Sequence, residues 1–144
     1  MFKHILIPTD GSEITGKAVE TAINLARAVG AKLSTISVKE PFPYSAISEM
    51  QPVPPQEFFD AQERIAAGRV KTVIDVANAA GLQCTGSTVE ALHPWEAILE
   101  HAAHEGVDLV VMASHGRRGM AALLLGSETQ RVLIHSKIPV LVVK

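Results

Sequence analysis

The segment ASHGRRGMAALLLGSE (residues 113–128) has residue types and spacing that suit the binding of a phosphate group. Nine residues separate Gly116 from Gly126, and Ser127 follows directly. Glycines let backbone N–H groups approach anionic oxygens with no side chain in the way. A Gly-Ser pair ahead of a helix adds that helix's unpaired N–H groups, its positive end and a hydroxyl. The spacing therefore predicts a phosphate site where this segment enters a helix.

A second candidate, IPTDGS (residues 7–12), follows an apolar run. Pro8 favours the end of a strand there, and Asp10 or Ser12 can cap the helix that follows. Alternatively, the Asp10 carboxylate accepts hydrogen bonds from a ribose hydroxyl, as an acidic residue does in dinucleotide sites. The sequence supports both interpretations of Asp10.

The charged residues of the first segment also have two interpretations. Arg117 and Arg118 either screen a phosphate or are solvated on an exposed loop, and His115 is a candidate for a position near the phosphate. The established phosphate motifs are absent: there is no Gly-Lys-Ser/Thr and no Gly-x-Gly-x-x-Gly. The residues alone predict no more than a crevice that accepts phosphate.

Metal and nucleophilic sites are not predicted elsewhere. His101 and His104 are spaced to share a helix face, but no third ligand is nearby in the sequence. The single Cys84 excludes an internal disulfide, and its place on an expected edge strand favours a structural role.

An alternation of apolar runs and helical segments must position these residues. Strands are expected at 2–7, 32–38, 108–112 and 139–143, with a more polar edge strand at 83–89. Helical periodicity predicts helices at 12–29, 58–80, 94–105 and 127–136. This order predicts an α/β fold with a mainly parallel sheet.

The unbroken apolar runs 5–7 and 109–111 belong at the buried centre of such a sheet. Ligands of doubly wound sheets lie outside the carboxyl ends of the strands, where the strand order reverses. Residues 8–10 and 113–119 would then face each other across one crevice. The proline-rich segment 39–56 has no convincing period and is expected to be a lid, an interaction loop or a mobile connection.

Composition narrows the class of protein. The chain has 144 residues, 47% of them hydrophobic and 19% charged, which suits one domain over 1–144. A net charge of −2 argues against a general binder of nucleic acid or of anionic membranes. No run approaches the roughly 20 apolar residues of a membrane helix, and we expect a soluble, cytoplasmic protein without membrane insertion.

The segments FKHILIPTDGSE (2–13) and VDLVVMASHGRRGMAALLLGSETQRVLIHSKIPVLVVK (107–144) resemble the universal stress protein family, and the likeness covers essentially the whole chain. In the ATP-binding branch of that family the loop reads Gly-x-x-Gly, nine residues, then Gly-Ser or Gly-Thr. Here Gly116, Gly126 and Ser127 match, but Ala113 replaces the first glycine. An alanine fits if its φ is negative and costs about 1 kcal/mol or more at positive φ.

The resemblance implies a doubly wound, five-stranded parallel sheet of order 3-2-1-4-5 with four helices, like the adenine nucleotide alpha hydrolases. It implies binding of ATP, AMP or another adenine nucleotide, with Mg²⁺ held through the phosphates. By the same resemblance, Pro8, Thr9 and Asp10 line the adenosine, and Val38 packs on the adenine. The remaining implied site residues are Met112, Ala113, His115, Gly116, Arg117, Gly119, Gly126, Ser127 and the backbone N–H of Glu128. The Glu128 carboxylate suits the helix dipole but repels phosphate unless it points away.

The implied role is a dimeric regulatory module of the stress response, paired through strand 139–143 and acting on an unknown protein partner. Ala113 and Glu128 favour an alternative, a dimeric interaction protein that binds no nucleotide. A slow ATP hydrolase is disfavoured, since no general base or second acidic metal ligand is evident beside the glycines.

Overall fold

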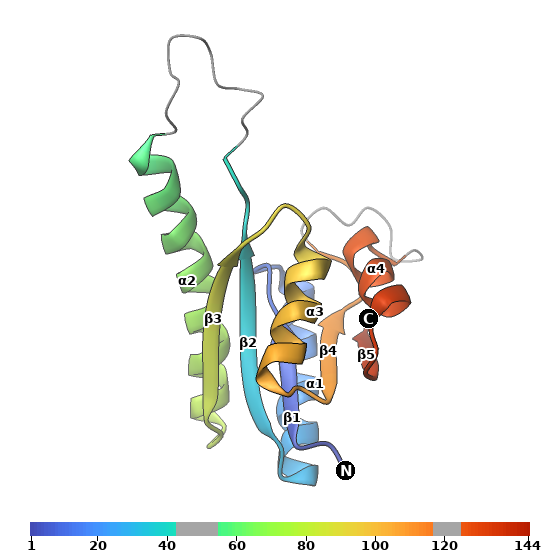
Figure 1. The fold of residues 1–144 in the computed structure, drawn as a ribbon. Coiled ribbons are helices and arrows are strands. Elements are labelled where there is room, and N and C mark those ends of the chain that lie inside the picture. The colour runs from blue at the N-terminus through green and yellow to red at the C-terminus, as the bar shows by residue number, and fades with distance from the viewer. Residues whose placement is uncertain (43–54, 117–124) are drawn as a thin grey trace.

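Five strands and four helices alternate along the chain (Figure 1). The computed structural model describes residues 1–42, 55–116 and 125–144. The elements are β1 (His4–Pro8), α1 (Glu13–Val29), β2 (Lys32–Lys39), α2 (Gln56–Ala79), β3 (Cys84–Glu90), α3 (Pro94–Glu105), β4 (Leu109–Ala113), α4 (Ser127–His135) and β5 (Val140–Val143). The predicted order is confirmed. The largest differences in bounds are two residues, at His4 instead of 2 and at Gln56 instead of 58.

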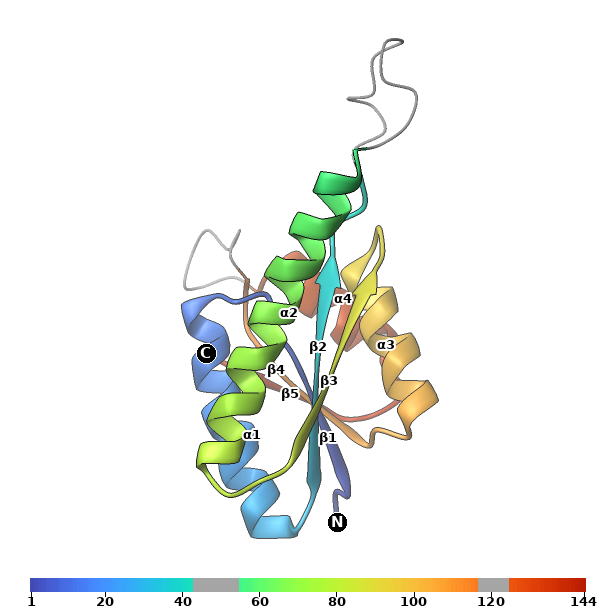
Figure 2. The ribbon, with the colours of Figure 1, turned by 90° about the vertical axis from the view of Figure 1, so that its left-hand side faces the viewer.

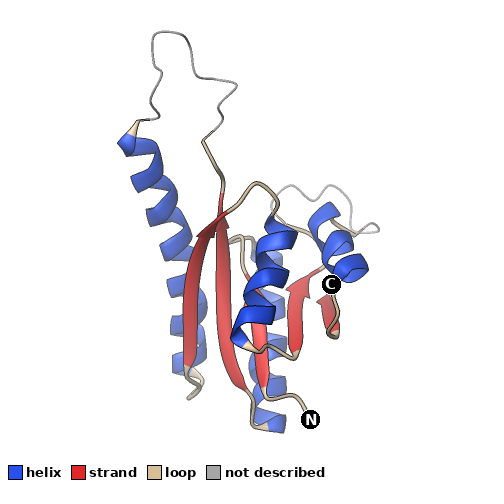
Figure 3. Ribbon diagram, viewed as in Figure 1, coloured by secondary structure: helices blue, strands red, loops and turns tan. Residues whose placement is uncertain are grey.

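All five strands are parallel and form one sheet of order β3-β2-β1-β4-β5, as predicted (Figure 3). The predicted edge strands, β3 and β5, lie at the two edges. The two runs expected at the centre are there, with Ile5 beside both Leu33 and Leu109. The strand order reverses between β1 and β4, so the loops that follow these two strands start side by side.

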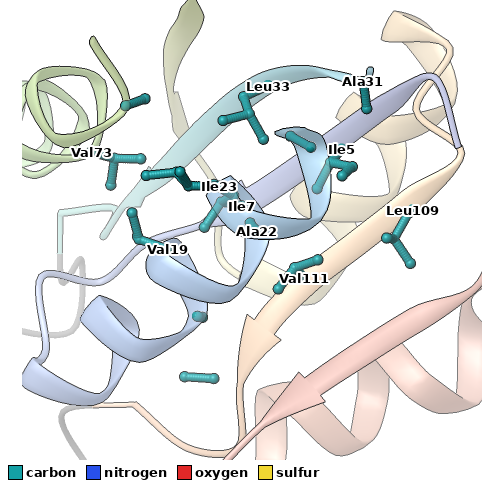
Figure 4. Packing of buried hydrophobic residues seen from close by; sticks show 14 residues of the cluster. Ile5, Ile7, Val19, Ala22, Ile23, Ala31, Leu33, Val73, Leu109 and Val111 are labelled. Atoms are coloured by element: carbon teal, nitrogen blue, oxygen red, sulfur yellow. The ribbon is translucent and has the colours of Figure 1, made fainter. Parts of the chain in front are cut away.

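Helices cover both faces of the sheet, α1 and α2 on one side and α3 and α4 on the other (Figure 2). Because successive strand side chains point to opposite faces, each face has its own core. Ile5, Ile7 and Val111 pack under α1, as Figure 4 shows. Leu6 and Val110 belong to the cluster that includes residues of α3 and α4.

Local signals end the helices where the sequence predicts. Gly30 and Gly106 follow α1 and α3 in the left-handed conformation, with φ of 73° and 69°. Pro94 occupies the first turn of α3, where its missing N–H is not needed. None of the described helices is long and apolar enough to cross a membrane.

Polar contacts join β1 to β4 at the amino ends of the strands, at the opposite edge of the sheet from the loops that follow these two strands. The Asp108 carboxylate accepts the backbone N–H groups of Lys3 (2.8 Å) and His4 (3.0 Å). Burial alone would raise the pKa of Asp108, but these N–H groups lower it. The buried His4 ring lies 2.8 Å from the Ser34 hydroxyl, and burial lowers the pKa of His4.

Candidate functional site

The turn after β1 is tightly organised at the carboxyl edge of the sheet. The N–H of the buried Thr9 donates to the carbonyl of Ile36 in β2 (2.9 Å). The Thr9 hydroxyl oxygen accepts the N–H of Gly11 (3.2 Å), and Gly11 takes a φ of 77°, which only glycine adopts readily. Pro8, Thr9 and Asp10 are thereby held against the end of β2.

The two oxygens of the Asp10 carboxylate have different surroundings. Oδ1 accepts the Ser12 N–H (2.9 Å) and the Thr15 hydroxyl (3.1 Å). Asp10 thereby holds the N-cap residue Ser12 and a hydroxyl of the first turn of α1, while the Ser12 side chain caps no backbone N–H of the helix. Oδ2 lies against the loop after β4, because a Cβ added to Gly116 would be only 2.3 Å from it. The two predicted segments thus meet at Asp10 and Gly116.

Ala113 is the last residue of β4 and packs into the core under α1. Its φ is not positive, since no described residue other than glycine has a positive φ. The condition under which an alanine fits here without strain is therefore met. Its carbonyl accepts the hydroxyl of the buried Thr129 in α4 (2.9 Å).

The base of the loop 115–125 is closed by two backbone hydrogen bonds at Ser114. Its N–H donates to the carbonyl of Val143 in β5 (2.8 Å), and its carbonyl accepts the Gly126 N–H (2.8 Å). A Cβ at Gly126 would lie 3.0 Å from the Cα of His115. Gly126 has a φ of −62°, so glycine is needed here for space and not for backbone conformation.

Helix α4 starts at Ser127, which is exposed, with its first backbone N–H groups lacking acceptors within the helix. Glu128 does point elsewhere: its Oε2 accepts the backbone N–H of Trp95 at the start of α3 (2.9 Å). The carboxylate is therefore directed toward the start of α3, but it stays in the first turn of α4, so its negative charge would remain near a phosphate bound at Ser127.

The other predicted residues have mixed surroundings. Val38 lies at the carboxyl end of β2, half-buried on the face of α3 and α4 and paired with Val89. Met112 is buried in the same core. The His115 Nδ1 lies 3.2 Å from the Ser114 hydroxyl. Arg117, Arg118 and Gly119 lie outside the described residues.

Cys84 lies in the edge strand β3. Burial raises the pKa of its thiol to about 11, so the thiol is protonated and a poor nucleophile at neutral pH.

Sequence reasoning missed two contacts that hold the site. Thr129 fixes the end of β4 to α4, and a hydroxyl near a helix start was the only available signal. Trp95, in the first turn of α3, stacks on His135 at the end of α4 with ring centres 4.3 Å apart. These contacts join residues far apart in the sequence, so no local spacing predicts them.

A groove of about 460 Å³ lies between α1 and α2, and Thr9, Gly11 and Ser12 of the turn after β1 form part of its wall. Arg69, Ile65 and Val76 are among the residues that line it. Its hydroxyls already have partners: those of Ser12 and Thr15 bond each other, and that of Thr72 bonds the Gly68 carbonyl.

Known proteins resemble the chain over its full length. The Universal stress protein family model matches residues 1–144. A universal stress protein of Thermus aquaticus is 33% identical over 145 residues, covering 100% of both chains. The solved structure of MJ0577 from Methanocaldococcus jannaschii has a TM-score of 0.84 at 28% identity, covering 100% of this chain and 96% of that one. A universal stress protein solved in complex with cAMP has a TM-score of 0.70 at 27% identity, covering 99% and 97%. With the family model matching every residue and the fold agreeing throughout, the chain belongs to the universal stress protein family.

Proposed function

We propose that this protein binds an adenine nucleotide at the carboxyl ends of β1 and β4 and acts as a dimeric regulatory module in the stress response. The observation that carries the proposal is the approach of Asp10 to Gly116, beside a loop closed at Gly126. This approach supports a ribose contact at the Asp10 carboxylate and a phosphate contact at the start of α4, which directly follows Gly126. ATP, AMP and related adenine nucleotides share both groups.

Each end of the nucleotide would have its own set of residues. The Ser127 hydroxyl and the first N–H groups of α4, including that of Glu128, would donate to a phosphate. Asp10 Oδ2 would accept from the ribose while Oδ1 keeps the turn in place. Val38 would pack on the adenine. The remaining residues of the proposed site are Pro8, Thr9, Met112, Ala113, His115, Gly116, Arg117, Gly119 and Gly126.

Two further observations support the proposal. The related protein of 27% identity was solved with an adenine nucleotide, cAMP. Ala113 fits without a positive φ, which removes one sequence argument against nucleotide binding. With ATP, Mg²⁺ would be held through the phosphates, since the Asp10 carboxylate is committed in part to the turn.

The proposed dimer forms through the edge strand β5, over residues Pro139–Val143. An edge strand presents unpaired N–H and C=O groups that a second copy can satisfy. Leu141 on this strand is exposed, and α4, which precedes it in the chain, exposes Leu133 and Ile134, the last by 74%. A cytoplasmic location and an unknown protein partner belong to the same proposal.

The alternative is a dimeric interaction protein that binds no nucleotide. The observation in its favour is the Glu128 carboxylate, which already lies at the start of α4 and bonds the start of α3. In that case the Glu128 carboxylate would serve as the anion at the starts of both α3 and α4, and neither helix start would need a bound phosphate.

Isothermal titration of the wild type with ATP plus Mg²⁺, AMP and cAMP tests the proposal. Asp10→Asn and Ser127→Ala should each weaken binding about tenfold, the value of one charge-assisted hydrogen bond. Asn keeps an oxygen for the Ser12 N–H, and thermal unfolding of each variant checks the fold. Absence of heat at millimolar nucleotide, with folded wild-type protein, would favour the alternative.

A further inference from the structure

One carboxylate, that of Glu128, joins the starts of two helices. Glu128 is the second residue of α4, and its Oε2 accepts the N–H of Trp95, the second residue of α3. Because every strand of the sheet is parallel, both helices begin at its carboxyl edge. The negative charge of Glu128 therefore lies at the edge of the sheet where the nucleotide is proposed to bind.

The charge of Glu128 is not offset by a cation among the described residues, since none of their ion pairs includes it. The residue is half-buried, which limits screening by water and salt. It lies directly after Ser127, next to the N–H groups that would receive a phosphate. A carboxylate in the first turn takes up part of the positive potential of a helix start.

We propose that Glu128 makes this site select nucleotides by phosphate charge, favouring adenosine monophosphates, cyclic or open, over ATP. The inference rests on the proposed nucleotide site at Asp10 and Ser127. A fixed negative charge repels every phosphate placed beside it, and the repulsion grows with the charge of the ligand. A terminal phosphate carries about −1.5 to −2 at pH 7, and the further phosphates of ATP add to that charge.

The wild type supplies the first measurement, which needs no variant. Measured without Mg²⁺, which would neutralise part of the charge of ATP, its Kd for AMP or cAMP should be lower than its Kd for ATP at the same ionic strength. A lower Kd for ATP than for AMP would overturn the inference and leave the proposed function intact.

Glu128→Gln is the second measurement, because the amide oxygen can still accept the Trp95 N–H while the charge is gone. The Kd for ATP should fall about tenfold and that for AMP about threefold, given the weaker repulsion of the smaller charge. Trp95 is the only tryptophan, so an unchanged fluorescence spectrum shows that the contact between α3 and α4 survives.

Glu20→Gln is the matched control. Glu20 is exposed within α1, so this change alters the net charge equally without touching the site. A role of Glu128 in selection would be refuted if the ratio of the Kd for ATP to the Kd for AMP were equal in wild type and Glu128→Gln. It would also be refuted if Glu20→Gln changed this ratio as much as Glu128→Gln does. If neither the wild type nor Glu128→Gln binds any nucleotide, the proposed function fails together with the inference.

Discussion

Gly116 and Gly126 are needed at the site for space and not for a left-handed backbone, since neither has a positive φ. The spacing of Gly116, Gly126 and Ser127 predicts the segment that meets Asp10. The physical reason for the glycines is a different one at each position. Gly116 leaves room for the Asp10 carboxylate, and Gly126 leaves room for the His115 backbone. The bond from Glu128 to Trp95 could not be predicted, because it joins two helices through the tertiary fold.

Gly116→Ala tests the close approach at the site. Its Cβ would lie 2.3 Å from Asp10 Oδ2, so the carboxylate or the loop must move. Nucleotide affinity should fall about tenfold or more, as misplacement of one binding group predicts. Gly16→Ala in α1 is the control, since its Cβ meets nothing within 4 Å. Equal affinity in both variants would mean that the approach of Asp10 to Gly116 does not matter for binding.

Periodicity in the sequence predicts the helices and strands far better than it predicts the contacts between them. The alternation of buried runs and helical stripes predicts all nine elements, because burial of one face imposes a period on each. The turn chemistry of Gly30 and Gly106 predicts where α1 and α3 end. The close packing of α2 on β3 at Gly86 has no sequence signal beyond a glycine within a strand.

Gly86→Ala should destabilise the protein by about 1–3 kcal/mol, the usual cost of overpacking. The new Cβ would lie 2.1 Å from Val70 Cγ1 and 2.9 Å from Ile74 Cδ1, so these side chains must leave their rotamers or α2 must shift from the sheet. Gly68→Ala in α2 is the control, because its Cβ meets nothing and alanine favours helix by up to about 1 kcal/mol. Urea denaturation measures the free energy of unfolding of both variants. A Gly86→Ala protein as stable as wild type would contradict the close packing of α2 on β3 at this position.

The amino ends of β1 and β4 should make stability depend on pH. Burial lowers the folded pKa of His4 below its ordinary value of 6.5, so the unfolded chain takes up the proton first. The free energy of unfolding should therefore fall as pH drops from about 6.5 toward the lower folded pKa. His4→Gln should flatten this dependence in urea titrations between neutral and mildly acidic pH. Asp108, with its lowered pKa, loses its contribution in a separate window below 3.8. An unchanged slope in His4→Gln would exclude His4 as its source.

At the scale of the whole molecule, β5 and α4 connect the proposed nucleotide site with the proposed dimer edge. Ser114, at the base of the loop, donates to the carbonyl of Val143 at the end of β5. Helix α4 starts at the proposed phosphate site and carries the exposed Leu133 and Ile134 near its other end. The strand order of the sheet, which the resemblance to the universal stress protein family implies, is what brings these features together.

Leu141→Lys should convert the proposed dimer into a monomer. The Leu141 side chain lies on the edge strand β5 and is 38% exposed, so a single copy of the protein can accommodate lysine there. In a dimer paired through β5, the two lysines would bring like charges to the shared edge and disfavour pairing. Sedimentation velocity measures the oligomeric state of each variant. Leu92→Lys, at an exposed position between β3 and α3, is the control that should leave the dimer intact. A dimer that survives Leu141→Lys, or a monomeric wild type, would reject pairing through β5.

A crystal structure of the protein with AMP would show directly whether the nucleotide lies between Asp10 and the start of α4. We predict a phosphate oxygen within about 3 Å of the Ser127 hydroxyl and a ribose hydroxyl at the same distance from Asp10 Oδ2. A nucleotide found elsewhere, for instance in the groove between α1 and α2, would contradict it, as would crystals with no nucleotide at saturating AMP.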